Sequence, residues 1–260
     1  MRTRRLQLVI IIAAGMLAVL QSPSPATAQA RGQGRGQAQP ATPAPPALRL
    51  PNGHPDLSGV WMGGGGVSER NLKPGDQILL TPDAKKMMDG RLSKDDPEAN
   101  CLPTGVPRMN PYPWRMIQTP THKAETHIFI NFEGNIHSYR QIFMDGRPHP
   151  KDPDPTWYGH STGRWEGDTL VVDTIGYNDK FWFDFDGHPH TTQLHTIERF
   201  TRTDLNTLSW DITIIDPGAY QKPFTVQTKA RYEPSWELME YICQENNTNV
   251  EHIQGPAKVR

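Results

Sequence analysis

The sequence predicts an all-β protein, an antiparallel up-and-down barrel of about eight to ten strands with one short N-terminal helix. Segments in which apolar and polar residues alternate recur between residues 125 and 232, and short turn sequences join most of them. Such connections exclude a parallel α/β sheet, whose strands need a long crossover. A long antiparallel sheet hides its edges by closing or by splitting, so a two-sheet β-sandwich is the alternative. A barrel of about eight strands has room for one small ligand.

The first 28 residues have the pattern of a secretory signal peptide. They contain a basic start (Arg2, Arg4 and Arg5), an apolar run over residues 6–20, and small residues before a predicted cleavage site after Ala28. The apolar run is shorter than the roughly 20 residues that a membrane-spanning helix needs. We therefore predict a periplasmic or secreted protein without membrane association once the signal peptide is removed.

The rest of the chain divides into a linker and one domain. Residues 29–48 consist mainly of Gly, Gln, Ala and Pro, which bury little surface, so they are predicted to be a disordered linker. Residues 49–260 have a length typical of one domain and are assigned to a single β-barrel domain. The formal net charge of −1 gives no reason to expect nucleic acid as a partner. The predicted partner is a small-molecule ligand or substrate, and the oligomeric state stays open.

The domain begins with a strand and a helix. Gly59-Val60-Trp61 has the G-x-W pattern of a first lipocalin strand, which is a resemblance over three residues. Thr81 is a typical N-cap, Pro82 suits the first turn and Gly90 suits the end, so a helix is predicted over residues 82–89.

The strand period predicts the remaining elements. In residues 125–133, Ile128 and Ile130 share one face and His127 and Phe129 the other. Residues 157–165 and 169–176 are predicted to form a central hairpin, closed by the turn Glu166-Gly167-Asp168. Further strands are predicted over residues 136–144, 191–200, 207–216, 223–232 and 236–243.

Cys101 and Cys243 are predicted to form a disulfide. The two residues are an isolated pair in a chain predicted to be exported, and a thiolate metal site would need more ligands at short spacing. The bond would tie the irregular segment 95–110 to the last strand. In the chain-entropy model it would stabilise the fold by on the order of 4 kcal/mol, which indicates a structural brace.

Histidine and carboxylate residues around the central hairpin are the candidates for acid–base catalysis. A His beside a carboxylate can transfer a proton, and an Arg can stabilise an anion formed on the substrate. Arg140 lies on an apolar strand face, so it either pairs with Glu198 or Asp173 or faces a ligand. The candidate catalytic residues are His160, His190, His195, Arg140 and Glu198.

Aromatic residues near the same segments are the candidates for substrate binding. Their rings can stack on a sugar, a terpenoid or an aromatic ligand, although such rings also fill protein cores. The candidates are Trp157, Tyr158, Trp182 and Tyr139.

A metal site is an alternative use of the histidines. His188, His190, His195 and Glu198 offer three nitrogens and a carboxylate, and their H-x-H start resembles a cupin site. However, the strand period places His195 and Glu198 on opposite faces, so the two cannot both point inward. We therefore predict no metal ligand among these residues and no cofactor.

A long motif suggests a family. The run RPHPKDPDPTWYGHSTGRWEGDTLVVDT, with CLPTGVPR and PYPWRMIQTP before it and KPF after it, resembles a group of exported bacterial β-rich proteins without an assigned activity. The resemblance covers nearly the whole domain and implies a single domain, but it implies no reaction.

These observations lead to three hypotheses. The first is an exported β-barrel enzyme that acts by His and carboxylate chemistry on a small sugar-like, terpenoid or aromatic molecule, as a lyase, isomerase, cyclase or hydrolase. The second is a non-catalytic, lipocalin-like ligand-binding protein. The third is a metal-dependent, cupin-like enzyme.

Overall fold

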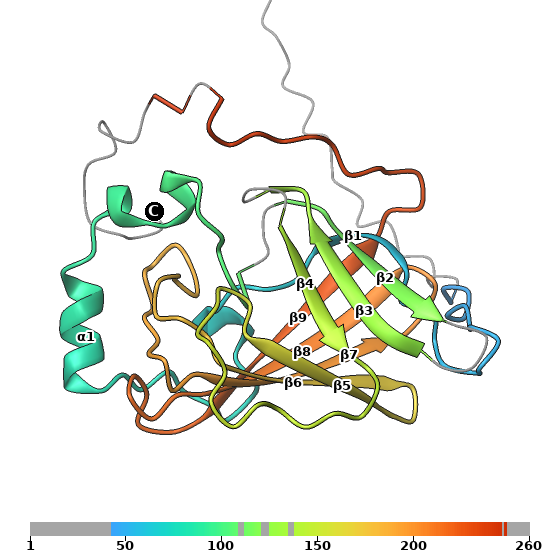
Figure 1. The fold of residues 1–260 in the computed structure, drawn as a ribbon, viewed down its shortest axis with the longest axis horizontal. Helices are drawn as coiled ribbons and strands as arrows, with labels where there is room; N and C mark the ends of the chain where they lie inside the picture. The colour runs from blue at the N-terminus through green and yellow to red at the C-terminus, as the bar shows by residue number, and fades with distance from the viewer. Residues whose placement is uncertain (1–42, 109–111, 121–124, 135–137, 246, 249–260) are drawn as a thin grey trace, which may run out of the picture. The chain divides into compact units, whose positions relative to one another are not determined.

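The computed structural model describes residues 43–108, 112–120, 125–134, 138–245 and 247–248, which belong to one compact unit (Figure 1). The predicted signal peptide and residues 29–42 of the predicted linker lie outside these residues. The end of the linker contacts the barrel, because the Leu205 N–H donates to the Pro45 carbonyl at 2.8 Å. No helix in the described ranges has the length and apolar character of a membrane span.

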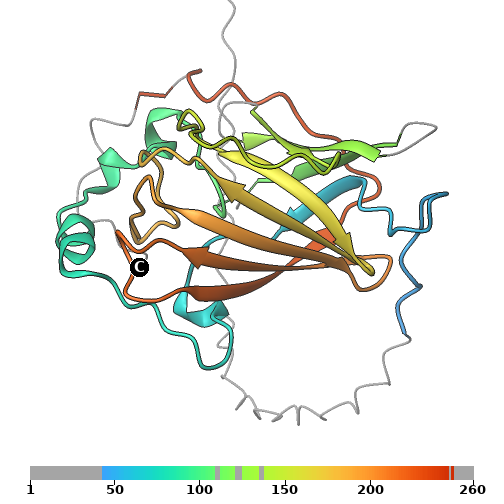
Figure 2. The same cartoon turned by 60° about the horizontal axis from the view of Figure 1, so that its bottom comes forward.

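In the described residues, nine strands form a closed barrel in which each strand pairs with the next and β9 pairs with β1 (Figures 1 and 2). The predicted barrel is therefore confirmed, and the two-sheet sandwich is not the observed architecture. The strands are β1 (Gly59–Gly63), β2 (Trp114–Pro120), β3 (Glu125–Phe132), β4 (Tyr139–Phe143), β5 (His160–Glu166), β6 (Thr169–Ile175), β7 (His195–Arg202), β8 (Thr207–Ile215) and β9 (Phe224–Tyr232).

The prediction that all strands are antiparallel is wrong at one place, because β4 and β5 are parallel. Residues 144–159 carry the chain back along the barrel before β5 begins. This connection contains Pro148, Pro150, Pro153 and Pro155, which cannot donate ladder hydrogen bonds and so prevent a hairpin with β4. Only Ile142↔Ser161 and Phe143↔Thr162 are paired across the two strands. The barrel wall is therefore weakly paired where β4 and β5 begin.

The helices lie outside the strands. The α helix α1 (Pro82–Asp89) has Thr81 as its N-cap, whose hydroxyl accepts a hydrogen bond from the Ala84 N–H at 3.2 Å. Figures 1 and 2 show α1 beside the barrel, and the connection between β8 and β9 contacts its N-terminus, where the Thr81 N–H donates to the Ala219 carbonyl at 2.9 Å. The described ranges also contain three short 3-10 helices: η1 (Glu69–Asn71), η2 (Ser93–Asp95) and η3 (Glu98–Asn100).

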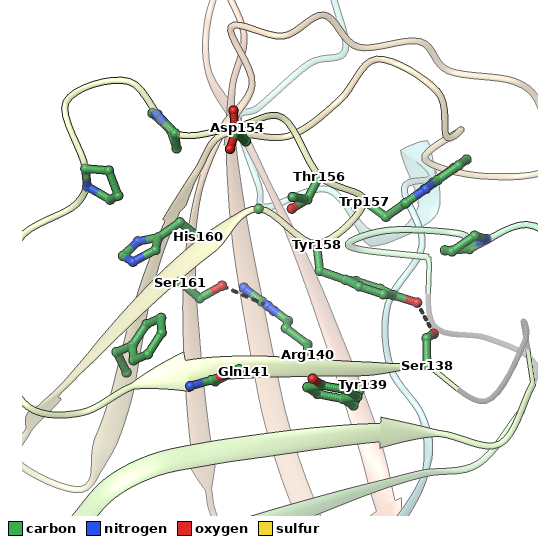
Figure 3. Close-up of a pocket in the computed structure, with 15 residues that line it drawn as sticks. Ser138, Tyr139, Arg140, Gln141, Asp154, Thr156, Trp157, Tyr158, His160 and Ser161 are labelled. Carbon is green, nitrogen blue, oxygen red and sulfur yellow. Dashed lines mark hydrogen bonds between the residues drawn. The ribbon is translucent and has the colours of Figure 1, made fainter.

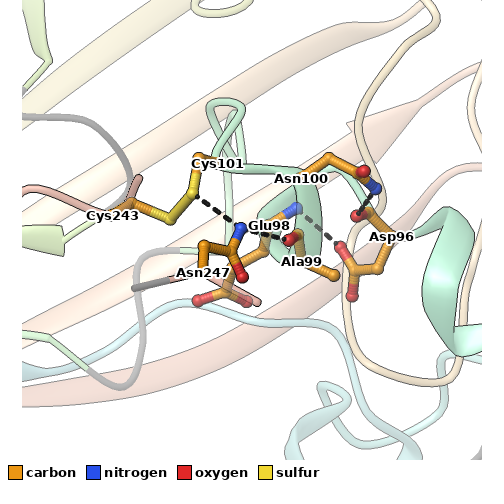
Figure 4. The surroundings of a disulfide bond; sticks show 7 residues. All are labelled: Asp96, Glu98, Ala99, Asn100, Cys101, Cys243 and Asn247. Atoms are coloured by element: carbon orange, nitrogen blue, oxygen red, sulfur yellow. Dashed lines mark hydrogen bonds between the residues drawn. A yellow bond between two sulfur atoms is a disulfide. The ribbon is translucent and has the colours of Figure 1, made fainter. Parts of the chain in front are cut away.

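The predicted disulfide is present between Cys101 and Cys243, whose Cα atoms are 5.5 Å apart (Figure 4). It does not join a strand, however, because no strand forms after β9 in the described residues up to 245. The prediction of a strand over residues 236–243 is therefore wrong. In this segment, Trp236, Met239 and Ile242 are exposed, so no apolar face is buried that would favour a strand. The disulfide ties this irregular segment to the one around η3.

The barrel interior is packed with large side chains. Trp61, Trp114 and Trp210 are fully buried there. The ring centroid of Trp114 lies 6.3 Å from that of Trp61 and 6.1 Å from that of Trp210. The predicted alternation holds, since Ile128 and Ile130 of β3 are also fully buried. These rings occupy the space in which a ligand was expected, as side chains fill a barrel of this size.

Two glycines near β5 are expected to respond differently to substitution by Ala. Gly167, in the hairpin turn, has φ +62° and open space where a Cβ would lie, so Gly167→Ala should cost about 1 kcal/mol through backbone strain alone. Gly159 has φ +65°, and a Cβ there would lie 2.6 Å from the Ile175 carbonyl oxygen. Gly159→Ala should therefore lower the free energy of unfolding by more than Gly167→Ala, as measured by urea unfolding. Equal losses would contradict the predicted clash.

Candidate functional site

A cavity of about 550 Å³ opens where β4 and β5 begin, at the weakly paired part of the barrel wall (Figure 3). Its walls come from β4, from the connection before β5 and from the first residues of β5. Most of the exposed surface in the cavity is apolar. The lining includes the side chains of Tyr139, Gln141, Phe143, Trp157, Tyr158 and His160.

Strand alternation decides which side chains reach this cavity from outside the barrel. On β4, Arg140 and Ile142 are buried, whereas Tyr139 is 61% exposed. On β5, Ser161 is fully buried, and its neighbour His160 is half-buried on the outer side. Figure 3 shows these two side chains leaving β5 in different directions, with Ser161 directed at Arg140. His160 is therefore the imidazole that the cavity wall presents.

His160 belongs to a chain of hydrogen bonds on the outer side of β5, β6 and β7. Its Nδ1 lies 2.8 Å from Nδ1 of His149, which comes from the Pro-rich connection. The other ring nitrogen of His149, Nε2, lies 3.0 Å from Oδ1 of Asp173 on β6. His195 on β7 places its Nε2 2.9 Å from the same oxygen. We call these four residues the histidine relay.

With both His149 and His160 neutral, the hydrogen bonds of the relay assign one tautomer to each ring. An ionised carboxylate only accepts hydrogen bonds, so the Nε2 atoms that contact Asp173 both carry hydrogen. A neutral His149 protonated at Nε2 has a lone pair at Nδ1, which must accept from His160. His160 therefore carries its hydrogen at Nδ1 and has a lone pair at Nε2. In the described part of the chain, Nδ1 is the one ring nitrogen of His160 with a side-chain partner.

The surroundings of His160 favour its neutral form. Partial burial lowers its pKa below the ordinary value of 6.5, and His149 and Arg147 lower it further. At neutral pH the ring is therefore a free base, and its lone pair is not lost to protonation. Phe143 stacks on the ring, with centroids 5.1 Å apart and planes inclined by 25°. This contact fixes the orientation of the base.

Arg140 and Glu198, two of the predicted catalytic residues, form a buried ion pair inside the barrel. Their side chains are 1% and 0% exposed, and Arg140 donates to both carboxylate oxygens, with Nη1 3.0 Å from Oε1. Nε of Arg140 donates to Ser161 at 3.1 Å, and Nη2 donates to Thr174 at 2.8 Å. Trp210 donates to Glu198 at 3.1 Å. The predicted pairing with Glu198 is confirmed, and both charges are engaged within the protein.

The remaining predicted residues are divided between several places. His195 joins the relay, and Trp157, Tyr158 and Tyr139 line the cavity with His160. Trp182 lines a different cavity, of about 560 Å³, beside the disulfide.

His188 and His190 lie outside the relay. His188 contacts Asp184 of its own loop through Nδ1 at 2.5 Å. His190 is 1% exposed between Phe181 and Phe183, with ring centroids 3.8 Å and 5.0 Å away. His190 therefore does not reach the cavity with His160.

The four residues of the cupin-like pattern do not converge. As the strand period predicts, His195 lies on the outer face of β7 and Glu198 on the inner face. His188 and His190 have separate partners in the loop before β7. Within the described ranges, no group of three or more His, Cys, Asp or Glu side chains has an arrangement suited to a metal ion.

The burial of His190 predicts a pH-dependent stability. Burial lowers its pKa from 6.5 to about 4, and Nε2 has no hydrogen-bond partner among the described residues. In the unfolded chain His190 has its ordinary pKa, so it binds a proton at a higher pH than in the folded protein. The contribution of neutral His190 to the free energy of unfolding is therefore fully present above pH 6.5 and is lost as the pH falls towards 4. We expect a loss of about 3 kcal/mol over this range. Urea unfolding of the wild type and of His190→Phe measures it, and an equal loss in the variant would contradict the assignment.

Two members of the relay, His149 and Asp173, were not predicted as site residues. The hairpin turn contains a signal for Asp173, since pairing Glu166 with Thr169 places Asp173 opposite Thr162, close to His160. His149 has no comparable signal, because its position depends on the path of the connection over residues 144–159.

Comparisons with protein-family models, with curated proteins and with solved structures find no match for this chain. The geometry of the cavity and of the histidine relay is therefore the basis for assigning a function.

Proposed function

We propose that the protein is an enzyme that uses His160 as a general base on a small organic molecule bound in the cavity between β4 and β5. The observation that carries this proposal is the relay from His160 through His149 to Asp173, with spacings of 2.8 Å and 3.0 Å. A neutral imidazole held in one tautomer, with a lone pair at the cavity wall, is suited to remove a proton.

The relay stabilises the charge that proton transfer creates. When Nε2 of His160 takes a proton from the substrate or from water, the ring becomes cationic. Its Nδ1–H then donates to His149, and the positive charge is attracted to Asp173 through that ring. His195 donates to the same carboxylate and keeps it in place. This chemistry serves a lyase, isomerase, cyclase or hydrolase without a cofactor.

The cavity suits a sugar-like, terpenoid or aromatic molecule. Rings from Trp157, Tyr158 and Phe143 supply flat apolar surfaces, and the Gln141 amide supplies a donor and an acceptor. The hydroxyl of Ser161 is not a candidate nucleophile, since it is fully buried and bonded to Arg140 and Thr174. We further propose that the protein acts after export to the periplasm or the medium, as its N-terminal sequence and its resemblance to exported bacterial proteins predict.

Incubation of the purified protein with a mixture of neutral saccharides, terpenoid alcohols and phenols, followed by mass spectrometry, tests the proposal. We expect the wild type to convert at least one compound that His160→Gln leaves unchanged. Arg199→Gln is a matched control, because Arg199 lies on the outer face of β7 near the relay but pairs with Glu166 at 2.9 Å. Equal conversion by wild type and His160→Gln would rule out the assigned base.

The same experiment separates the two alternatives. A lipocalin-like carrier shares the closed barrel, although side chains fill the interior, and it would bind a compound from the mixture without converting it. A metal-dependent enzyme would lose its activity on treatment with a chelator and regain it with zinc, iron or manganese. The proposed acid–base enzyme keeps its activity in the chelator.

A further inference from the structure

A row of aromatic rings crosses the outer face of β3 and β4, and the rings at its two ends, Tyr139 and Phe143, line the cavity. Its ring centroids are separated by 6.1 Å from Tyr139 to Phe129, 5.7 Å from Phe129 to His127, and 5.3 Å from His127 to Phe143. Phe143 in turn stacks on His160 at 5.1 Å. The row therefore extends from the candidate base over two neighbouring strands. We call these rings, without His160, the aromatic row.

The aromatic row is on the outer side of the barrel wall. The residues that alternate with it, Ile128, Ile130 and Ile142, are fully buried in the interior. Tyr139 is 61% exposed, and His127, Phe129 and Phe143 are each half-buried. These rings consequently do not belong to the packed core, and core filling does not explain their presence.

Amide side chains alternate with the rings on the same face. In the β3–β4 register, Gln141 lies opposite Phe129, and Asn131 lies opposite Tyr139. Each amide offers both a donor and an acceptor beside an aromatic surface. A saccharide has this combination of needs, because the C–H face of a pyranose ring packs on an aromatic ring while its hydroxyl groups form hydrogen bonds. A purely apolar ligand would leave the amides without partners.

The charges at the cavity oppose an anionic ligand. Of the lining residues, Arg140 is the one arginine, and its charge is engaged by Glu198. Asp154, also in the lining, carries a negative charge. Beyond the cavity, Arg147 lies over the Phe143 ring at 4.0 Å but is paired with Asp145 at 2.5 Å. A carboxylate or phosphate within the cavity would therefore find no unpaired arginine among the described lining residues.

We propose that the aromatic row binds an uncharged oligosaccharide chain whose reacting unit lies in the cavity beside His160. The identity of the reacting unit rests on the function proposed above, whereas binding to the row does not require catalysis. A chain of several sugar units explains why two rings of the row, Phe129 and His127, lie on β3 beyond the residues that line the cavity of about 550 Å³. Loss of one ring from the row should weaken binding by about tenfold.

Affinity gel electrophoresis of the purified protein tests the proposal, with hydroxyethyl cellulose, glucomannan and soluble starch as neutral probes and alginate as the anionic probe. We expect at least one neutral polysaccharide to retard the wild type, and alginate not to. Phe129→Ala should weaken this interaction about tenfold. Trp236→Ala is the matched control, because Trp236 is an exposed ring in the segment after β9, and its loss should change nothing.

Several outcomes would overturn the proposal. They are no retardation by any neutral polysaccharide, equal retardation by alginate, or equal effects of Phe129→Ala and Trp236→Ala. Binding of 2-naphthol that depends on Phe129, without polysaccharide binding, would assign the row to an apolar ligand instead. His160→Gln separates this proposal from the proposed function. If His160→Gln binds polysaccharide like the wild type and also converts substrate, the assignment of His160 as the general base is wrong, whereas the proposed binding to the aromatic row stands.

Discussion

Replacement of Arg140 by Met should lower the free energy of unfolding by about 3–5 kcal/mol. The guanidinium is 1% exposed and is the cationic partner of Glu198, which is itself fully buried. Without it, the carboxylate stays in the barrel interior with the Trp210 N–H as its one remaining described hydrogen-bond partner. An uncompensated buried charge costs far more than the lost contacts alone. Urea unfolding with the disulfide kept intact measures the change.

The double variant Arg140→Met/Glu198→Met is the control for this result. It removes both charges and leaves apolar side chains of similar length, so most of the lost stability should return. A single variant that loses less than about 1 kcal/mol would show that water or a rearranged side chain compensates Glu198. A double variant no more stable than the single one would show that the loss comes from packing.

His160→Gln should lower kcat/KM by about 10²–10⁴ on any substrate that the protein converts. The amide keeps hydrogen-bonding capacity near His149 but cannot accept a proton at the cavity wall. Asp173→Asn should have a smaller effect, because it leaves the base in place but removes the charge that attracts the cationic ring and the carboxylate that holds the His149 tautomer. Steady-state kinetics of both variants against the wild type measures the two effects.

The pH dependence of kcat/KM provides a second check on the same base. His160 is active when neutral, so activity should fall as the pH drops through its pKa. Burial places this pKa below 6.5, and the acid limb of the profile should therefore lie below pH 6.5. Arg147→Gln removes a nearby cation that lowers the pKa and should move the limb towards higher pH. A limb that does not move, or that persists unchanged in His160→Gln, would contradict the assignment.

Local periodicity in the sequence determines which side of the wall each residue faces. It places His195 and Glu198 on opposite faces of one strand and Ile128 and Ile130 inside the barrel, as the structure has them. The reason is that successive Cβ atoms of a strand point to opposite sides, whatever the strand pairs with. The hairpin around Gly167 follows in the same way from a few adjacent residues.

The tertiary structure alone decided which segments that are distant in the sequence lie side by side. Strand alternation does not reveal that β4 and β5 are parallel, because the direction of β5 depends on how the connection over residues 144–159 crosses the barrel. That crossing brings His149 to His160 and leaves the wall weakly paired where the cavity opens. His190 is close to His195 in sequence but is buried between Phe181 and Phe183 of the loop before β7. Residues that are remote along the chain meet only when the barrel closes, and this closure follows from the packing of the whole domain.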